Sequence, residues 1–166
     1  MNEYPWSAPD EMASEYEVFD FLYGLVRLIK PHVVVETGTY RGHSAETMGQ
    51  AIKANGFGSV FTAETDKELL REAEKRFIGL PVYTYHDKGI KMLESIAGPI
   101  DLAYIDSGDR KTEILYLQNS GKLSKRAYVL FHDAFREEFQ EVAAITNWWN
   151  FTIPTKRGLG IFVIGK

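Results

Sequence analysis

Acidic residues recur at the ends of the apolar segments of this chain, where carboxylates could hold a ligand or move a proton. They are Glu36, Glu64, Asp87, Asp106 and Asp133. Taken singly, each is as well explained by the return of the chain to water or by capping of the next helix. Taken together, the five acids favour a shared role, because helix caps need no common edge and no glycine-rich turn beside them.

The segments around these acids are expected to alternate between strand and helix. Apolar runs predict strands over 32–37, 58–64, 82–86, 100–106 and 127–133. Helical patterns predict helices over 44–55, 67–78, 89–97, 110–123 and 135–149. One more helix precedes the first strand, with an apolar stripe from Met12 to Val26. The last two strands, 150–155 and 158–166, are joined so tightly that they must pair as an antiparallel hairpin.

This alternation predicts an α/β fold of the doubly wound, Rossmann-like kind. We expect a mostly parallel seven-stranded sheet with helices on both faces and the antiparallel hairpin at its C-terminal side. Residues 1–166 contain no repeat or linker and are expected to form a single domain, with an N-terminal arm and helix over 1–30 and a core over 33–166. The carboxyl ends of parallel strands share one edge, so the five acids should surround one crevice.

Composition limits the classes of partner. The chain has 166 residues, of which 45% are hydrophobic, so it can bury a core. Its formal net charge of -4 gives no general attraction to nucleic acid or anionic membranes. It has no cysteine, no apolar run near the ~20 residues of a membrane span and no signal-peptide pattern. We therefore expect a cytoplasmic protein that acts on a small molecule.

The turn after the first strand, ETGTYRG, is the most specific signal for a ligand. Gly38 and Gly42 lack a Cβ, so the backbone can approach a ligand closely there. The helix that follows presents free N–H groups at the same place. Glu64 lies about twenty residues farther along, where nucleotide-type sites place an acid on the ribose hydroxyls.

The kind of nucleoside follows from what the turn lacks. Its glycines are spaced G-x-x-x-G and not G-x-G-x-x-G, and the chain has no P-loop lysine pattern. Glu36 would repel a pyrophosphate but suits a ligand with positive charge. S-adenosylmethionine carries a sulfonium, an ammonium and a ribose but no phosphate.

These motifs resemble class I S-adenosylmethionine-dependent methyltransferases, and most closely the small-molecule O-methyltransferases that include the catechol, sugar and macrolide enzymes. The resemblance runs in motif order from VVETGTYRGHSA through VFTAETD, YHDKGIKML and IDLAYIDSGDR to AYVLFHDAF. It implies S-adenosylmethionine as the cofactor and a hydroxylated small molecule as the substrate. The cofactor-binding residues that it implies are Glu36, Thr37, Gly38, Thr39, Tyr40, Gly42, Ser44, Glu64, Thr65, Asp87 and Asp106.

The same resemblance implies that Asp106, Asp133 and His132 carry the reaction. His132 is a candidate general base, and a histidine paired with a neighbouring acid is the equal alternative. Metal-dependent relatives bind magnesium through the fourth-strand acid and an acidic pair after the fifth strand. Here that pair is Asp133-Ala134, so a Mg²⁺ site would consist of Asp106 and Asp133, with Asp109 or His132 replacing the missing ligand.

Several alternatives stay open. Proteins of the cephalosporin-hydroxylase type share this fold and a similar His-Asp pair after the fifth strand, and a module that binds an adenosyl ligand without catalysis would also need the turn. About thirty residues precede the first strand, fewer than such enzymes use to cover the substrate, so the pocket is open or a homodimer completes it. Arg110 and Arg157 are interpreted as loop cations, and PTKRGLG either is a solvated turn or meets an acidic group of the substrate.

Overall fold

A computed structural model describes residues 6–165, so the first five residues of the expected arm, and Lys166, lie outside the described part. The helices are α1 (Tyr16–Ile29), α2 (His43–Asn55), α3 (Lys67–Glu74), α4 (Gly89–Ser95), α5 (Arg110–Ser120) and α6 (Glu137–Ile145). The strands are β1 (Val33–Thr37), β2 (Ser59–Ala63), β3 (Val82–Tyr85), β4 (Ile100–Ile105), β5 (Leu123–His132), β6 (Trp149–Ile153) and β7 (Leu159–Val163).

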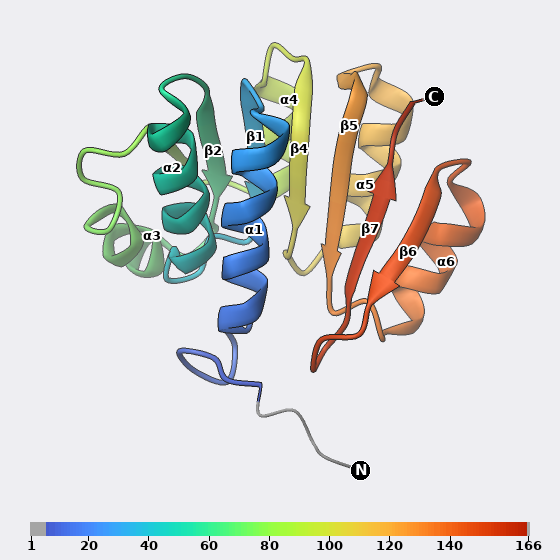
Figure 1. Ribbon diagram of the computed structural model, residues 1–166, viewed down its shortest axis with the longest axis horizontal. Helices are drawn as coiled ribbons and strands as arrows, with labels where there is room; N and C mark the ends of the chain where they lie inside the picture. The colour runs from blue at the N-terminus through green and yellow to red at the C-terminus, as the bar shows by residue number, and fades with distance from the viewer. Residues whose placement is uncertain (1–5, 166) are drawn as a thin grey trace.

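The seven strands form one sheet in the order β3-β2-β1-β4-β5-β7-β6. Strands β1 to β5 are parallel, whereas β7 runs antiparallel to both β5 and β6. Figure 1 shows α1 and α2 in front of this sheet and α4, α5 and α6 behind it. The predicted fold class, with its mostly parallel sheet and C-terminal hairpin, is confirmed.

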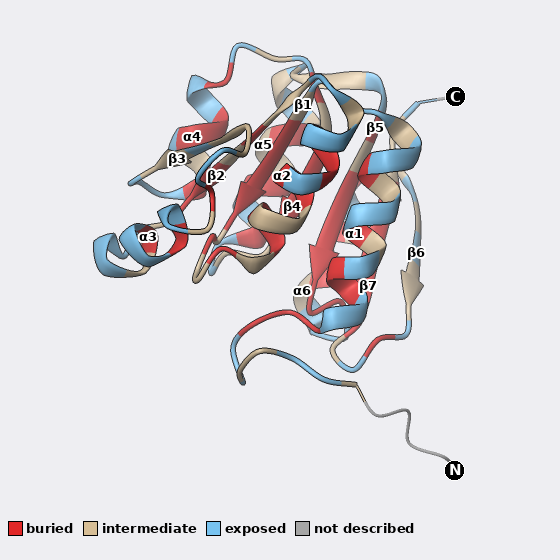
Figure 2. Ribbon diagram, turned by 60° about the vertical axis from the view of Figure 1, so that its left-hand side comes forward, coloured by how far each residue is buried: buried red, intermediate tan, exposed pale blue. Residues whose placement is uncertain are grey.

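The core has two layers because successive side chains of a strand point to opposite faces. On β1, Val34 packs with α1 and α2, while Val35 packs with α4, α5 and α6. The central strands are therefore buried on both sides, as the red ribbon in Figure 2 shows, and they need near-continuous apolar sequence. Among the described helices, none is both long and apolar enough to cross a bilayer.

Several predicted boundaries were wrong. Helix α1 begins at Tyr16 and not at Met12, because the Asp10 carboxylate accepts from the backbone N–H groups of residues 12 and 13 and holds them in a separate turn. Helix α3 ends at Glu74, although its pattern continues to residue 78. Helix α5 ends at Ser120 because Gly121 takes a left-handed conformation with φ of 69°, and β5 begins two residues later.

The strand order reverses between β1 and β4, which is where doubly wound sheets bind their ligands. Gly38 has a φ of 87°, and at this residue the turn after β1 packs directly on the end of β4. A Cβ on Gly38 would lie 2.5 Å from the carbonyl oxygen of Asp106. Glycine is thus required here for close packing of two turns as well as for its backbone angle.

Candidate active site

A cavity of about 570 Å³ lies at the carboxyl ends of the strands, a size typical of small-molecule sites. Its two sides differ in construction. The turns after β1, β2 and β3 form what we call the turn half, lined by Gly38, Tyr40, Glu64, Thr65 and Asp87. The segments after β4, β5 and β6 form what we call the arginine half, lined by Asp106, Arg110, Asp133, Arg136 and Arg157.

Glu64 is the most firmly oriented side chain of the turn half. The backbone N–H of Tyr40 donates to its Oε2 at 2.8 Å, and those of Thr65 and Asp66 donate to its Oε1 at 2.8 and 2.9 Å. Oε1 also accepts from the Thr65 hydroxyl at 3.4 Å, so its lone pairs are used, whereas Oε2 keeps one, because each carboxylate oxygen accepts about two hydrogen bonds. Glu64 is therefore a fixed acceptor that can take a hydroxyl group of a ligand at Oε2. Asp87 follows β3 at the same edge, where it is exposed.

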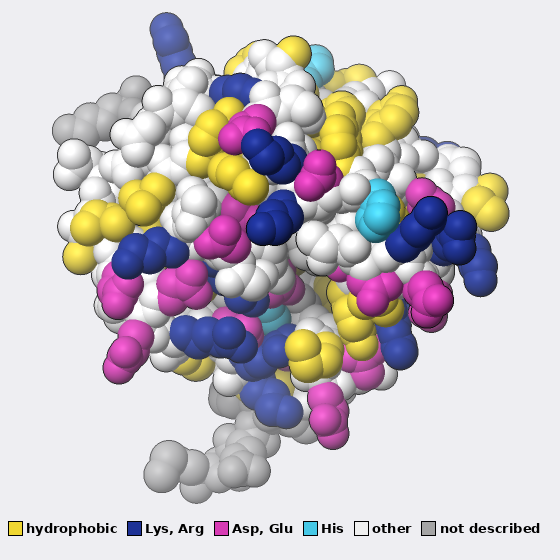
Figure 3. Space-filling view, turned by 180° about the vertical axis from the view of Figure 1, so that it is seen from behind, with side chains coloured by type: hydrophobic (Ala, Val, Ile, Leu, Met, Phe, Trp, Pro, Cys, Tyr) yellow, Lys and Arg dark blue, Asp and Glu magenta, His cyan; other side chains and the backbone are white. Residues whose placement is uncertain are grey.

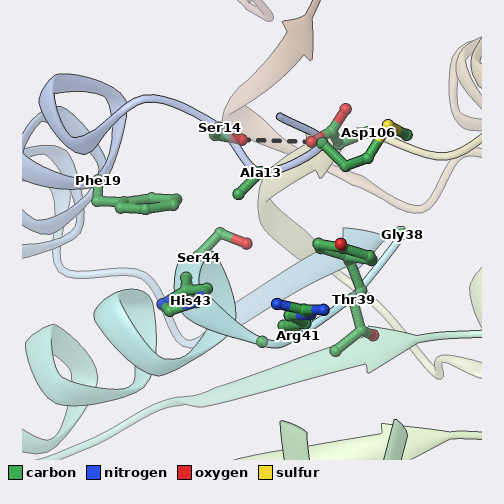
Figure 4. A pocket seen from close by; sticks show the side chains of 12 residues that line it. Ala13, Ser14, Phe19, Gly38, Thr39, Arg41, His43, Ser44 and Asp106 are labelled. Atoms are coloured by element: carbon green, nitrogen blue, oxygen red, sulfur yellow. Dashed lines mark hydrogen bonds between the residues drawn. The ribbon is translucent and has the colours of Figure 1, made fainter. Parts of the chain in front are cut away.

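A second, smaller cavity of about 20 Å³ continues the turn half beneath the N-terminal segment (Figure 4). It has room for roughly one water molecule. Four residues line both cavities: Met12, Gly38, Tyr40 and Asp106. Of the sequence-predicted cofactor residues, Thr39, Gly42 and Ser44 line only the smaller cavity.

Glu36 and Thr37 line neither cavity. Glu36 is fully buried, and the Thr62 hydroxyl donates to its Oε2 at 2.5 Å. Burial raises the pKa of Glu36 to about 8. The hydroxyls of Ser44 and Thr62 lower this pKa, but by less than burial raises it. Within residues 6–165 its Oε1 has no hydrogen-bond partner. Contact of Glu36 or Thr37 with a cofactor therefore stays a prediction.

Thr37 instead donates its hydroxyl to Glu113 of α5, a residue that the sequence patterns did not single out. The Ser107 hydroxyl donates at 2.8 Å to the same carboxylate oxygen, Glu113 Oε2. Burial raises the pKa of Glu113 to about 7. Glu113 thus joins the end of β1 to α5, and it lines the larger cavity.

His132 joins the end of β5 to the N-terminal segment. It is fully buried, with Nδ1 3.1 Å from Asp106 Oδ1 and Nε2 3.0 Å from Glu15 Oε2. Burial alone would lower the pKa of His132, but the two carboxylates outweigh it and raise the pKa to about 9. The ring is then an imidazolium that donates from both nitrogens. This is the alternative to a general base, namely a histidine paired with neighbouring acids. It lines neither cavity, so a role as general base stays a prediction.

Residues 10–15, which we call the strap, lie across the sheet edge. Ser14 Oγ is 2.7 Å from the Tyr104 hydroxyl and donates to Asp106 Oδ2 at 3.3 Å (Figure 4). Glu15 also accepts from the backbone N–H of Arg157, and the Arg157 guanidinium donates to the carbonyl of Ala13 at 2.6 Å. Burial would raise the pKa of Glu15, yet the His132 imidazolium and the backbone N–H groups of Glu15 and Arg157 lower it to about 2.

The strap contains candidate site residues that the sequence patterns did not identify. Ser14 and Glu15 fall inside the stretch where the apolar stripe predicts a helix, and the helix begins only after them. Their polar pair directly before the observed start is the kind of signal that marks a helix start and could have identified them. Their partners lie about a hundred residues away, and no local pattern indicates such pairs.

Three arginines surround Asp133. Its Oδ2 lies 3.1 Å from Arg110 Nη2 and 2.9 Å from Arg136 Nη2, and its Oδ1 lies 3.3 Å from Arg157 Nε. Arg110 Nη2 also lies 2.6 Å from Asp106 Oδ1. The interpretation of Arg110 as a loop cation is wrong, because it begins α5 and is only 6% exposed.

Asp106, His132 and Asp133 come together as predicted, with one potential ligand atom of each within 4.8 Å of the others. They do not fit magnesium, however. Asp106 Oδ1 and Asp133 Oδ2 already bind guanidinium groups, and both nitrogens of His132 face carboxylates. Magnesium prefers oxygen ligands and gives up its bound water reluctantly, and at this site it would also have to expel these cations.

The sequence and the fold are similar to those of known methyltransferases. A family model described as a methyltransferase domain matches residues 35–134. No curated protein matches the sequence. A Podospora anserina methyltransferase with bound SAH is similar in structure, with a TM-score of 0.84 at 16% identity, over 96% of this chain and 82% of that one. The O-methyltransferase TomG of Streptomyces achromogenes, in complex with SAM, has a TM-score of 0.81 at 17% identity, over 95% and 83%.

An O-methyltransferase from Bacillus cereus in complex with SAH has a TM-score of 0.75 at 16% identity, over 93% of this chain and 84% of that one. At such low identities these three similarities establish the fold. The family model spans more than half of the chain and establishes the family, which confirms the resemblance found in the sequence. The chain belongs to the methyltransferase family that this model describes.

Proposed function

We propose that this protein transfers a methyl group from S-adenosylmethionine to a hydroxyl oxygen of a small molecule. The observation that carries the proposal is Glu64, whose carboxylate three backbone N–H groups hold at the wall of a cavity that reaches Asp106. Such a fixed acceptor, with a lone pair left at Oε2, suits a ribose hydroxyl, and no phosphate-binding motif competes with that role.

The residues of the turn half fit this cofactor. Glu64 would accept from the ribose hydroxyls, and Asp87 would lie near the amino group of the adenine. The backbone at Gly38 and Tyr40 would border the methionine part. When bound, S-adenosylmethionine supplies a methyl group on a sulfonium, which is reactive enough to need no covalent enzyme intermediate.

Asp106 lies where the two halves meet. It belongs to the arginine half of the larger cavity and also lines the smaller cavity, which continues the turn half. Burial would raise its pKa, but His132 and Arg110 outweigh burial and lower it, so Asp106 stays ionised. It is thus suited to accept a hydrogen bond from the acceptor hydroxyl and to hold the oxygen in line with the methyl group. The hydroxyl proton would pass to Asp133 or to water as the C–O bond forms.

His132 acts in this scheme as a positioning residue that fixes Asp106 and the strap. Magnesium has no part in the scheme, because its ligand atoms are already paired with cations.

Calorimetric titration with S-adenosylmethionine and with S-adenosylhomocysteine tests the proposal. Micromolar binding of both is expected, together with loss of binding in Glu64→Ala. If neither ligand binds at millimolar concentration, the proposal fails. If both bind but no hydroxylated acceptor is methylated in a broad screen, the protein is a non-catalytic module that binds an adenosyl ligand.

Three expectations from the sequence belong with this proposal. They are a cytoplasmic location, a homodimer that helps to cover the substrate, and the lack of a nucleic-acid partner. The strap already covers part of the sheet edge within one chain, so a second subunit would be needed only over the part of the cavity that the strap leaves open. Light scattering at micromolar protein concentration would decide the oligomeric state.

A further inference from the structure

In the arginine half, three guanidinium groups form ion pairs with only two carboxylates among the described residues. Arg110, Arg136 and Arg157 face two carboxylates, those of Asp106 and Asp133. Asp109 and Glu113 also line the cavity, but within residues 6–165 no ion pair joins either carboxyl group to these arginines. Figure 3 shows basic side chains gathered with acidic ones around a hollow in the lower part of the rear face.

The three arginines come from separate segments of the chain. Arg110 begins α5, Arg136 directly precedes α6, and Arg157 lies in the turn between β6 and β7. A structural role accounts for two of them. Arg110 donates to the Ser107 carbonyl and is almost buried, and Arg157 holds the strap through the carbonyl of Ala13.

Arg136 is the arginine for which a structural role explains least. Its side chain is 61% exposed, and its single ion pair among the described residues joins Nη2 to Asp133. A guanidinium has five N–H donors in a planar fork, so most donors of Arg136 stay available beside the cavity that it lines. That fork matches the two oxygens of a carboxylate or phosphate group.

We infer that Arg110, Arg136 and Arg157 bind an oxyanion group, a carboxylate or a phosphate, of the methyl acceptor. The inference rests on the proposed function and gives its substrate class: a hydroxylated organic acid or phosphate ester. The position of the arginines supports the inference. They lie on the far side of Asp106 from Glu64, which is the part of the cavity that remains for the acceptor when the cofactor occupies the turn half. Arg136 is the exposed contact, while the two less exposed arginines supply fixed positive charge behind it.

Matched acceptors test the inference by calorimetry with the protein saturated with S-adenosylhomocysteine. The probes are catechol, 3,4-dihydroxybenzoate and 2-hydroxyphenyl phosphate, so that the carboxylate and phosphate sources are separated. The variant is Arg136→Gln. Its matched control is Arg126→Gln, an equal loss of charge at an exposed position near the start of β5, at the opposite edge of the sheet.

We expect at least one of the two anions to bind about tenfold or more tightly than catechol, which is the gain of one charge-assisted contact. Arg136→Gln should abolish this preference and Arg126→Gln should retain it. Equal binding of anions and catechol, a preference that survives Arg136→Gln, or no anion binding at millimolar concentration would each overturn the inference. The affinity for S-adenosylhomocysteine is measured first. Binding of this ligand without an anion preference would contradict the inference alone, whereas no binding would contradict the proposed function. If Arg136→Gln weakens that affinity, the arginines serve the carboxylate of the cofactor and the inference is wrong.

Discussion

The two halves of the cavity are held together by different kinds of contact. In the turn half, backbone N–H groups from neighbouring turns fix Glu64, and Gly38 lets two turns approach each other. The arginine half rests on buried side-chain ions that connect residues far apart in sequence, such as Glu15 and His132, which lie behind Asp106. The turn half can therefore lose a side chain with little loss of stability, whereas the arginine half couples the site to folding.

This difference has a physical origin. A hydrogen bond between adjacent turns costs little chain entropy, and its groups stay partly in contact with water. A buried ion must keep its partner, because removal of that partner leaves a charge in a medium of low dielectric constant. Substitutions in the two halves should therefore separate into those that affect binding and those that affect stability.

The largest effect on stability is expected for His132→Ala. The change leaves Asp106 and Glu15 without the imidazolium that lies between them, and it opens a cavity in the network. The free energy of unfolding should fall by about 3–5 kcal/mol, as for other broken buried ion pairs. Urea denaturation near neutral pH measures it. His86→Ala, at an exposed position, should change it by less than about 0.5 kcal/mol. A similar small change in both variants would mean that the buried ions do not hold the strap.

Glu64→Ala should show the opposite behaviour. It removes the acceptor of the ribose hydroxyls, and the three N–H groups that it frees can bind water. The affinity for S-adenosylhomocysteine should fall about tenfold to hundredfold, while the unfolding midpoint changes little. Calorimetry and urea denaturation of the same preparation give both quantities. Glu68→Ala, at an exposed position of α3, is the control. A large loss of stability in Glu64→Ala would remove the distinction between the halves.

The same distinction explains how much could be predicted from the sequence. The sheet and the turn half depend on local signals, namely apolar periodicity, the glycines of ETGTYRG and the acids at strand ends. Those signals alone are enough to predict that Gly38, Glu64 and Asp87 share one edge of the sheet. The arginine half depends on pairs such as Glu15 with His132 and Arg110 with Asp133, which lie far apart in the chain. No periodicity encodes such pairs.

Glu36 lies behind the turn half and follows a different rule, since it is a buried acid with no ion pair to any other residue of 6–165. Its pKa is raised by burial from an ordinary 4.5 to about 8, so the folded state keeps a proton that the unfolded state releases above its ordinary pKa. The free energy of unfolding should therefore decrease as the pH rises from 4.5 toward 8. Between about pH 6 and pH 8, ionisation of Glu36 should account for at most about 2 kcal/mol of this decrease in the free energy of unfolding.

Glu36→Gln tests this by urea denaturation across the same pH range. The amide cannot ionise, so the decrease of stability with pH should be smaller than in the wild type. A remainder is expected from Glu113, whose pKa of about 7 is raised in the same direction. Glu72→Gln, at an exposed position of α3, should retain the wild-type slope. Parallel curves for wild type and Glu36→Gln would show that Glu36 is ionised in the folded protein at neutral pH.

The smallest effect is expected from metal removal, and it concerns the arginine half alone. Magnesium at Asp106 and Asp133 would have to displace Arg110 from both acids and approach the His132 imidazolium. Treatment with EDTA, or addition of millimolar Mg²⁺, should therefore change the affinity for S-adenosylhomocysteine by less than about twofold. Methyl transfer, once an acceptor is known, should be equally insensitive. A strong requirement for Mg²⁺ would mean that the arginines move away from the acids when the metal binds. The arginine half would then be a flexible site like that of metal-dependent enzymes, and its coupling to folding would be weaker than the buried ion pairs indicate.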